Sequence, residues 1–259
     1  MPILEMFVLK EKVALVTGGA SPFGRQIVAA LGEAGAETYI ASRNVEALEE
    51  VVAEQRSLGY RVVALHVDQG DEQSILTLRE EIKERSRRLD ILVNNAVARS
   101  MTGYRDKAAA FQDSMTVNAT GLFLITRAMA DLMVENGKGS IINIASTLGM
   151  TGPDPMLEGI PLDGWKPDYF FHKGGLINFT RYIAGYYGSK GIRCNSISPG
   201  GLHRSSMPED FVKSYCAHTC LGRMAIGSDV KGVVVFLASD ASSYITGVNI
   251  PVDGGLTAA

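Results

Sequence analysis

Short apolar runs alternate with longer helical patterns along this chain, and the alternation restricts its fold more than any other feature. The runs are almost continuously apolar, which is typical of strands buried on both faces of a parallel sheet. They occupy residues 13–17, 38–42, 62–68, 91–94, 140–145, 193–198 and 249–252. Helical stretches lie between them, at 24–34, 45–57, 71–88, 108–136 and 169–188. This order predicts an α/β fold with a doubly wound, seven-stranded parallel sheet and helices on both faces.

The composition is that of one ordinary globular domain. The chain has 259 residues, of which 46% are hydrophobic and 20% are charged, and no repeat or linker divides it. We therefore expect a single domain over residues 1–259. The net charge of −3 gives no electrostatic reason to bind nucleic acid or an anionic membrane. No uninterrupted apolar stretch is long enough to cross a bilayer, so no membrane partner is expected.

Two features favour a cytoplasmic location. The first residues lack the basic segment and long apolar run of a signal peptide. Cys194, Cys216 and Cys220 do not form a disulfide framework, which is typical of a reducing compartment. Cys216 and Cys220 are expected to share a helix face near His218, but no second group of metal ligands appears and zinc normally takes four. No metal is expected.

A glycine-bearing turn joins the first predicted strand to the first predicted helix. Gly18, Ser21, Phe23 and Gly24 belong to this turn, Thr-Gly-Gly-Ala-Ser-Pro-Phe-Gly. In a Rossmann unit, such a turn lets the backbone approach a pyrophosphate at the positive end of the helix. The alternative is a plain tight turn, but the strand before it and the helix after it favour a dinucleotide site.

The end of the second predicted strand indicates which dinucleotide binds. An NAD enzyme usually carries an acidic residue there, which binds the ribose 2′-hydroxyl. Here the acid is missing, and Ser42 is followed by Arg43. A guanidinium suits a 2′-phosphate by charge and by forked hydrogen bonding, so NADP(H) is favoured over NAD(H), which stays possible. The competing interpretation is that Arg43 is a solvated surface residue.

Two further strand ends complete the expected adenosine site. Asp68 follows the third strand and is able to accept a hydrogen bond from the adenine amino group, or alternatively to cap the next helix. Asn95 and Ala96 follow the fourth strand, where small side chains and backbone are expected to pack beside the adenosine ribose.

Tyr169 and Lys173 indicate the chemistry. Four residues apart on one helix, they lie on the same face, about one turn from each other. The ammonium favours a phenolate that would otherwise form only at a pH of about 10. The pair therefore offers a proton donor and acceptor that is usable near neutral pH. The spacing alone occurs by chance in many helices, so its weight depends on the other motifs.

Together these pieces resemble the short-chain dehydrogenase/reductase family, over nearly the whole chain. The motifs that carry the resemblance are the glycine-bearing turn at residues 17–24, Asn94-Asn-Ala96, Val117-Asn118, Ile144-Ala-Ser146, Tyr169-x-x-x-Lys173, Ser198-Pro-Gly200 and Val252-Asp-Gly-Gly255. The resemblance implies a single Rossmann-fold domain that binds NAD(P) and interconverts a secondary alcohol and a ketone by hydride transfer.

The resemblance also implies a role for each matching residue. Tyr169 would be the catalytic acid/base, and Lys173 would activate it and hold the ribose hydroxyls of the nicotinamide half. Ser146 would orient the substrate oxygen, and Asn118 would hold a water that links Lys173 to solvent. Tyr169 and Lys173, with Pro199 and Gly200, are thereby added to the expected cofactor contacts. Considered without the other motifs, Asn118 is interpreted as a helix residue whose amide forms local hydrogen bonds. Ser146 is interpreted as a strand-end residue whose hydroxyl hydrogen-bonds to a turn.

The chain departs from the family pattern in four places. Pro22 replaces a glycine of the dinucleotide turn and removes one N–H donor, which puts the affinity for phosphate in doubt. Val97 and Arg204 replace a glycine and a threonine, and Ser205 or Ser206 are able to substitute for the threonine. Ser146 and Tyr169 are 23 residues apart, about ten more than the family's common spacing, and the extra residues fall in a Pro-rich loop.

These departures are similar to those of bacterial gluconate 5-dehydrogenase-like and surface-glycan-linked members, which suggests a sugar, polyol or sugar acid as the small-molecule substrate. The expected pocket walls are residues 97–101, 148–165 and 201–207. Asp154, Glu158, Asp163 and Trp165 would suit a sugar ring. Arg99, His203 and Arg204 would instead suit a carboxylate or phosphate, and every one of these side chains is also able to be merely solvated.

Three functions stay open on the sequence. The first is an NADP(H)-dependent alcohol/ketone oxidoreductase, and the second is a reductase of a 3-oxoacyl thioester on a carrier protein. The third is a non-catalytic dinucleotide-binding sensor, which the presence of Ser146, Tyr169 and Lys173 disfavours. The helices at 108–136 and 169–188 carry apolar residues on more than one face. In the family such helices pair between subunits, so a homotetramer is expected; the alternative is that the monomer's core uses both faces.

Overall fold

The structure is a computed structural model of the chain and describes residues 2–155 and 162–258. Its centre is one parallel sheet of seven strands in the order β3-β2-β1-β4-β5-β6-β7. The strands are β1 (Val13–Thr17), β2 (Glu37–Ser42), β3 (Val62–His66), β4 (Ile91–Asn94), β5 (Gly139–Ile144), β6 (Ile192–Pro199) and β7 (Asn249–Val252). The predicted doubly wound sheet is confirmed, and the strand order reverses between β1 and β4. Ligands of such folds bind at this switch point, outside the carboxyl ends of the strands.

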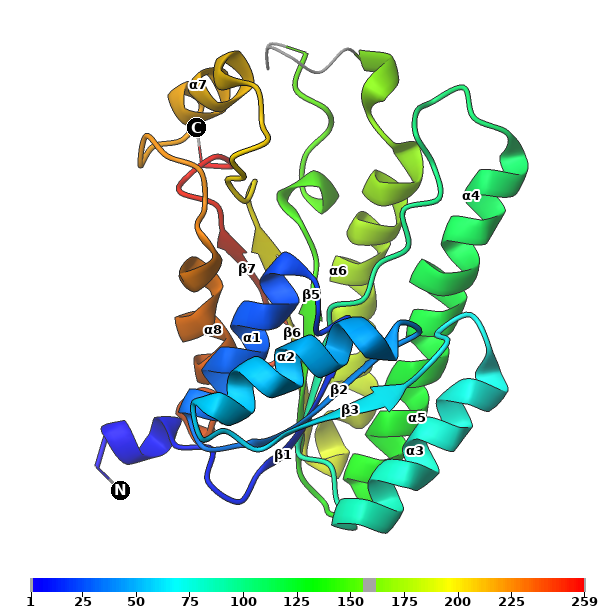
Figure 1. Cartoon of the computed structure of the whole chain (residues 1–259), viewed down its shortest axis with the longest axis vertical. Helices are drawn as coiled ribbons and strands as arrows, with labels where there is room; N and C mark the ends of the chain where they lie inside the picture. The colour runs from blue at the N-terminus through cyan, green and yellow to red at the C-terminus, as the bar shows by residue number, and fades with distance from the viewer. Residues whose placement is uncertain (1, 156–161, 259) are drawn as a thin grey trace.

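Helices cover both faces of the sheet (Figure 1). One face carries α1 (Pro22–Glu33), α2 (Val45–Ser57) and α8 (Lys231–Ala238), and the other carries α3 (Glu72–Ser86), α4 (Ala108–Met115), α5 (Leu122–Glu135) and α6 (Pro167–Tyr187). The short helix α7 (Glu209–Ala217) lies beyond the carboxyl ends of the strands, near the C-terminus. This helix therefore stands at the edge of the sheet where ligands are expected.

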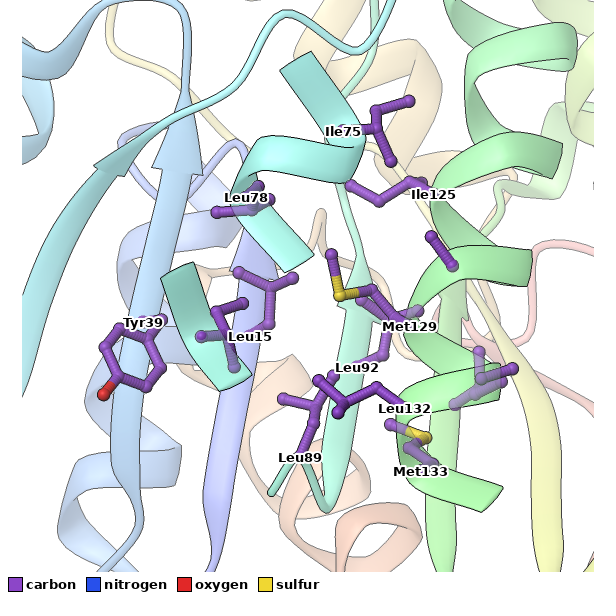
Figure 2. Close-up of a cluster of buried hydrophobic side chains, with 14 of the residues drawn as sticks. Leu15, Tyr39, Ile75, Leu78, Leu89, Leu92, Ile125, Met129, Leu132 and Met133 are labelled. Atoms are coloured by element: carbon purple, nitrogen blue, oxygen red, sulfur yellow. The ribbon is translucent and has the colours of Figure 1, made fainter. Parts of the chain in front are cut away.

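Each face of the sheet has its own buried core. On one face, Leu15 and Leu92 of the strands meet leucine, isoleucine and methionine side chains of α3 and α5 (Figure 2). On the other, Val16 and Ile142 pack against α1 and α8. A fully buried leucine contributes about 1.5–3 kcal/mol through removal of its surface from water, so the two cores together fix the sheet and its helices.

The helix predicted over 108–136 differs from the expectation in one respect. A π-helical turn, Thr116–Gly121, interrupts it between α4 and α5. Single π turns widen a helix locally and are frequent at functional sites. Over Ala108–Glu135 this helix also has the length and mean hydropathy of a membrane span, although polar and charged residues such as Asp113 and Arg127 interrupt it. Half of its most apolar window is buried inside the protein, as in a core helix, so it gives little support for a membrane span.

Candidate active site

Tyr169 and Lys173 meet on α6 as their spacing predicts. The Lys173 Nζ lies 5.6 Å from the centre of the Tyr169 ring and donates a hydrogen bond of 2.5 Å to the main-chain oxygen of Ile144. Only 4% of Lys173 is exposed. The ammonium therefore lies between the tyrosine ring and the end of β5, and the acid/base role of the pair stays a prediction.

Burial changes the acidity of Lys173. Removal of its ammonium from water, together with the nearby charge of Arg99, lowers its pKa from 10.5 to about 7. A lysine that titrates near neutrality is able to give up and regain a proton without a large cost. Perturbed pKa values of this kind are common at catalytic sites, although structural ion pairs also produce them.

Ser146 lies two residues past Ile144, the main-chain partner of Lys173, at the start of a short turn that follows β5. Its Oγ accepts a 3.2 Å hydrogen bond from the Leu148 amide, so the hydroxyl caps the 3-10 turn Thr147–Gly149. The turn packs tightly on α6, because a Cβ on Gly149 would lie 2.6 Å from the main-chain carbon of Lys173. The Ser146 hydroxyl proton has no acceptor among the described residues, and it is therefore able to donate to a substrate oxygen.

Asn118 lies in the π turn, and its side chain is occupied. Its Oδ1 accepts from the Ala98 amide and its Nδ2 donates to the Ala98 oxygen, both at 2.8 Å. The second Nδ2 hydrogen bond, of 3.0 Å, goes to Ser114 Oγ. Asn118 thus fixes the loop after β4. A water held here would bond to the main chain or to the remaining lone pair of Oδ1, and this role stays a prediction.

Sequence reasoning missed a group of buried polar residues behind Tyr169. Ser114 Oγ donates a 2.5 Å hydrogen bond to Asp168 Oδ2, which joins α4 to α6. His172 packs edge-on against the Tyr169 ring, with ring centres 5.1 Å apart. The signal was available in the helical spacing, because Asp168 and His172, like Ser114 and Asn118, are four residues apart and therefore share a face.

His172 is neutral in this environment. Burial, and then the positive charges of Lys173 and Arg99, lower its pKa from 6.5 to about 3. Its Nε2 is buried and has no hydrogen-bond partner in the described part of the chain. An unprotonated imidazole beside two cations avoids a third positive charge next to the Tyr169 ring.

The expected dinucleotide site also assembles at this edge of the sheet. Gly18 has a φ of +66°, and a Cβ on it would lie 2.9 Å from the Ala96 Cα. The Asn95 side chain donates to the oxygens of Thr17 and Gly18 and to Ser21 Oγ, at 2.9–3.1 Å. The Thr17 hydroxyl accepts from the amides of Asn95 and Ala96. The loops after β1 and β4 are thereby held together, and glycine is required where they touch.

Pro22 fits the turn better than the sequence suggested. It occupies the first position of α1, where the N–H that proline lacks has no helical partner in any case. Ser21 caps the helix by accepting from the Gly24 amide at 3.1 Å. The Phe23 amide has no acceptor among residues 2–155 and 162–258. It remains at the positive end of the helix as a donor for a phosphate, so these residues fit a dinucleotide.

Arg43 and Asp68 lie at the ends of β2 and β3. Arg43 is exposed, and it forms no ion pair within the described part of the chain, so its guanidinium is accessible to a ligand. Ser42 Oγ donates to the Asn44 oxygen. The alternative prediction that Asp68 caps α3 is wrong, because Asp71 is the cap of that helix. Asp68 Oδ1 instead accepts from the Gly70 amide. Oδ2 of Asp68 is left for the adenine hydrogen bond, which stays a prediction.

Pro199 and Gly200 end β6 beside α7. The Gly200 amide donates to the Val252 oxygen at 3.0 Å, and the Gly201 amide donates to the Tyr215 hydroxyl at 2.5 Å. A Cβ on Gly200 would lie 3.0 Å from that hydroxyl. This turn is therefore held between β7 and α7, at the same edge of the sheet as the other predicted cofactor contacts.

Described residues of the Pro-rich loop contact the loop after β4 and the end of α7. The Asp163 oxygen accepts from the Tyr104 amide, and Asp154 lies 3.8 Å from the His218 ring. Trp165 packs against the cluster of Tyr215 and Met224 rather than presenting an isolated aromatic face, and its Nε1 is buried without a partner in the described residues. Glu158 lies outside the described residues. His203 and Arg204 are both exposed, on the segment between β6 and α7.

The cysteines differ from one expectation. Helix α7 ends at Ala217, so Cys216 and Cys220 do not share a helix face; Cys220 Sγ instead donates to the Gly255 oxygen. All three cysteines are free thiols, and the described residues contain no cluster of three metal ligands.

A cavity of about 640 Å³ lies at the amino ends of the strands, bounded by Lys12, Asp90, Lys138 and Arg193. It is therefore at the opposite end of the sheet from the candidate site.

The fold and these groupings define a dinucleotide-dependent oxidoreductase, and comparison with known proteins agrees. A family model described as enoyl-(acyl carrier protein) reductase matches residues 18–257. The chain is 34% identical to the uncharacterized oxidoreductase YxbG of Bacillus subtilis, over 96% of this chain and 92% of YxbG. It is 30% identical to the 3-oxoacyl-[acyl-carrier-protein] reductase FabG of Thermotoga maritima, over 96% and 98%.

A solved structure has a similar fold over the full length of the chain. The gluconate 5-dehydrogenase of Burkholderia cenocepacia, in complex with NADP and tartrate, superposes with a TM-score of 0.89 at 28% identity over the full length of both chains. The chain therefore belongs to the short-chain dehydrogenase/reductase family and is an NAD(P)-dependent oxidoreductase.

Proposed function

We propose that this protein interconverts a secondary alcohol and a ketone of a sugar, polyol or sugar acid, with NADP(H) as cofactor. The observation that supports the proposal is the buried Lys173 ammonium, 5.6 Å from the centre of the Tyr169 ring, at the strand end that Ser146 follows. Bound nicotinamide would supply or accept the hydride. Tyr169 would give the substrate oxygen its proton, Ser146 would orient that oxygen, and Lys173 would hold the proton supply.

The preference for NADP(H) is part of this proposal. It is supported by the accessible Arg43 at the end of β2, where no acidic side chain stands. Gly18, Ser21, Phe23, Gly24, Asn95 and Ala96 would hold the pyrophosphate and adenosine, with Ser42 and Asp68 beside them. Pro199, Gly200 and the Tyr169–Lys173 pair would hold the nicotinamide half.

A homotetramer in the cytoplasm is proposed on separate grounds. Aromatic rings stand out on the outer faces of α5 and α6: 42% of Phe123 is exposed, 66% of Phe171, 60% of Tyr182 and 54% of Tyr186. Exposed aromatic surface of this kind is typical of a subunit interface. Sedimentation of the purified protein at several concentrations measures the oligomeric state directly.

The second candidate is a 3-oxoacyl-thioester reductase, favoured by the similarity to the Thermotoga maritima reductase. An assay of the rate of NADPH oxidation, measured by absorbance, compares the two candidates. The substrates tested are sugar ketones, keto acids and a 3-oxoacyl thioester. We expect turnover with the first two classes and little with the thioester. Preference for the thioester would replace the proposed substrate class.

Tyr169→Phe tests the proposed chemistry. The variant loses the phenol proton but keeps the ring that packs on Lys173, so we expect NADPH binding to remain and turnover to fall by roughly 100-fold or more. Tyr104→Phe, an exposed tyrosine in the loop after β4, is the matched control. Turnover near the wild-type level in Tyr169→Phe would refute the acid/base role.

A further inference from the structure

Arg99 lies directly over the proposed acid/base. Its guanidinium carbon is 5.1 Å from the centre of the Tyr169 ring, and its charge reaches both Lys173 and His172. Arg99 itself is exposed, and no carboxylate of the described residues forms an ion pair with it. An accessible cation without an ion pair in the described residues thus stands over the ring that carries the proposed acid/base hydroxyl.

Hydrogen bonds from helices α4 and α6 hold the loop that carries Arg99. The preceding residue, Ala98, is bound at both its amide and its oxygen by the Asn118 side chain. Asn118 donates to Ser114, and Ser114 donates to Asp168, only 2% of which is exposed. This chain of hydrogen bonds runs from α6 through α4 to the loop after β4. The backbone from which Arg99 extends is therefore fixed relative to Tyr169 on the same helix α6.

Two carboxylates, one on the loop of Arg99 and one next to Tyr169 on α6, bond to groups other than Arg99. Asp106, in the same loop, accepts from the amides of Thr102 and Gly103 and from the Thr102 hydroxyl. Asp168 Oδ2 accepts from Ser114, and its buried Oδ1 has no hydrogen-bond partner in the described residues. The charge of Arg99 is consequently left for a group that comes from outside the described chain.

We propose that Arg99 binds the carboxylate of a hydroxy acid or sugar acid, so that the secondary alcohol or ketone of the same molecule faces Tyr169. The proposal rests on the alcohol–ketone chemistry proposed above. A guanidinium matches a carboxylate with two parallel hydrogen bonds, which fixes orientation as well as affinity. In oxidation, the hydride of the C–H bond would go to the nicotinamide and the hydroxyl proton to the Tyr169 phenolate, while the carboxylate stays unchanged.

A carboxylate is favoured over a phosphate because one guanidinium matches one negative charge. The cations that would help to hold a phosphate, His203 and Arg204, extend from the separate segment between β6 and α7, and neither contacts Tyr169 in the described residues. Sugar phosphates serve as an arm of the test for this reason.

The test compares Arg99→Met with the wild-type protein on matched substrates. Gluconate supplies the carboxylate, and sorbitol, the corresponding uncharged polyol, lacks it; gluconate 6-phosphate adds the phosphate. We expect the kcat/KM for gluconate to fall roughly 10- to 100-fold in Arg99→Met, mainly through KM. That for sorbitol should fall much less, and only through kcat and its pH dependence, because the charge of Arg99 also lowers the pKa of Lys173. Arg105→Met, an exposed arginine of the same loop, is the matched control and should change neither.

Tartrate gives a readout that does not depend on turnover. Calorimetric titration of tartrate into the protein with NADP⁺ should give binding that is lost in Arg99→Met and kept in Arg105→Met. Equal losses on gluconate and sorbitol would mean that Arg99 acts on proton transfer, and unchanged tartrate affinity would mean that it binds no carboxylate; either result overturns the proposal. Preference for the phosphorylated acid overturns the choice of carboxylate. If no alcohol is turned over, the proposed function fails, and the tartrate titration still decides the role of Arg99.

Discussion

The Lys173 ammonium is hydrogen-bonded, at 2.5 Å, to the main-chain oxygen of Ile144, the last residue of β5. This bond ties helix α6 to the carboxyl edge of the sheet at the residue that lies beside the proposed acid/base, Tyr169. It also places a cation where water does not reach, which has measurable consequences for stability.

Stability should depend on the ionisation of Lys173. Its pKa is 10.5 in the unfolded chain and about 7 in the folded protein, so between these values the unfolded chain binds more protons. Unfolding free energy must therefore rise with pH across this window and fall as the pH drops toward 7, by a few kcal/mol. In Lys173→Met this rise should be missing, and the variant should be inactive. Thermal melts from pH 7 to 10 measure it, with the exposed Lys213→Met as control; parallel curves for wild type and Lys173→Met would contradict the expectation.

The acid limb of stability should depend on His172. Its pKa falls from 6.5 to about 3 on folding, so the folded protein binds fewer protons in this range, and stability is lost as the pH falls through it. His172→Phe keeps a planar ring and removes both the titratable imidazole and the unpaired Nε2. We expect its urea midpoint to exceed that of the wild type at pH 5 by more than it does at pH 7. The exposed His66→Gln is the control, and an equal difference at both pH values would show that burial of this imidazole does not govern acid stability.

Cofactor choice should depend on Arg43. Arg43→Asp replaces a guanidinium that suits a 2′-phosphate with a carboxylate that repels it and suits a ribose hydroxyl. We expect the ratio of kcat/KM for NADP(H) over NAD(H) to fall by on the order of 100-fold. Arg61→Asp, at the opposite edge of the sheet, should leave the ratio unchanged. A constant ratio in Arg43→Asp would remove Arg43 from the cofactor site.

Gly18 should be needed both for backbone conformation and for space. Gly18→Ala places a Cβ at a positive φ and 2.9 Å from the Ala96 Cα. We expect a loss of about 1–3 kcal/mol in unfolding free energy and weaker NADPH binding. Gly59→Ala is the matched control, because Gly59 also has a positive φ, of +86°, but a Cβ there meets nothing within 4 Å. It should share the strain and keep the NADPH affinity; equal affinities in the two variants would argue against a cofactor at this turn.

Local pattern determined much of this protein. The runs at 13–17 and 91–94 became fully buried strands with the predicted limits, because continuous apolar runs are stable between two layers of helices. The run at 249–252 also became a strand with the predicted limits, although it is only partly buried at the edge of the sheet. The spacing of Tyr169 and Lys173 placed them together because a helix repeats every 3.6 residues. Both are short-range properties of the chain, which the order of residues fixes directly.

Tertiary structure decided what depends on contacts between distant segments. The π turn at Thr116–Gly121, the hydrogen-bonded path from Asp168 through Ser114 and Asn118 to Ala98, and the placement of Arg99 over Tyr169 all join residues of different elements. No local periodicity encodes these contacts. The same holds for the pKa of Lys173 and His172, because the charge states of the two side chains follow from how deeply the packed protein removes them from water.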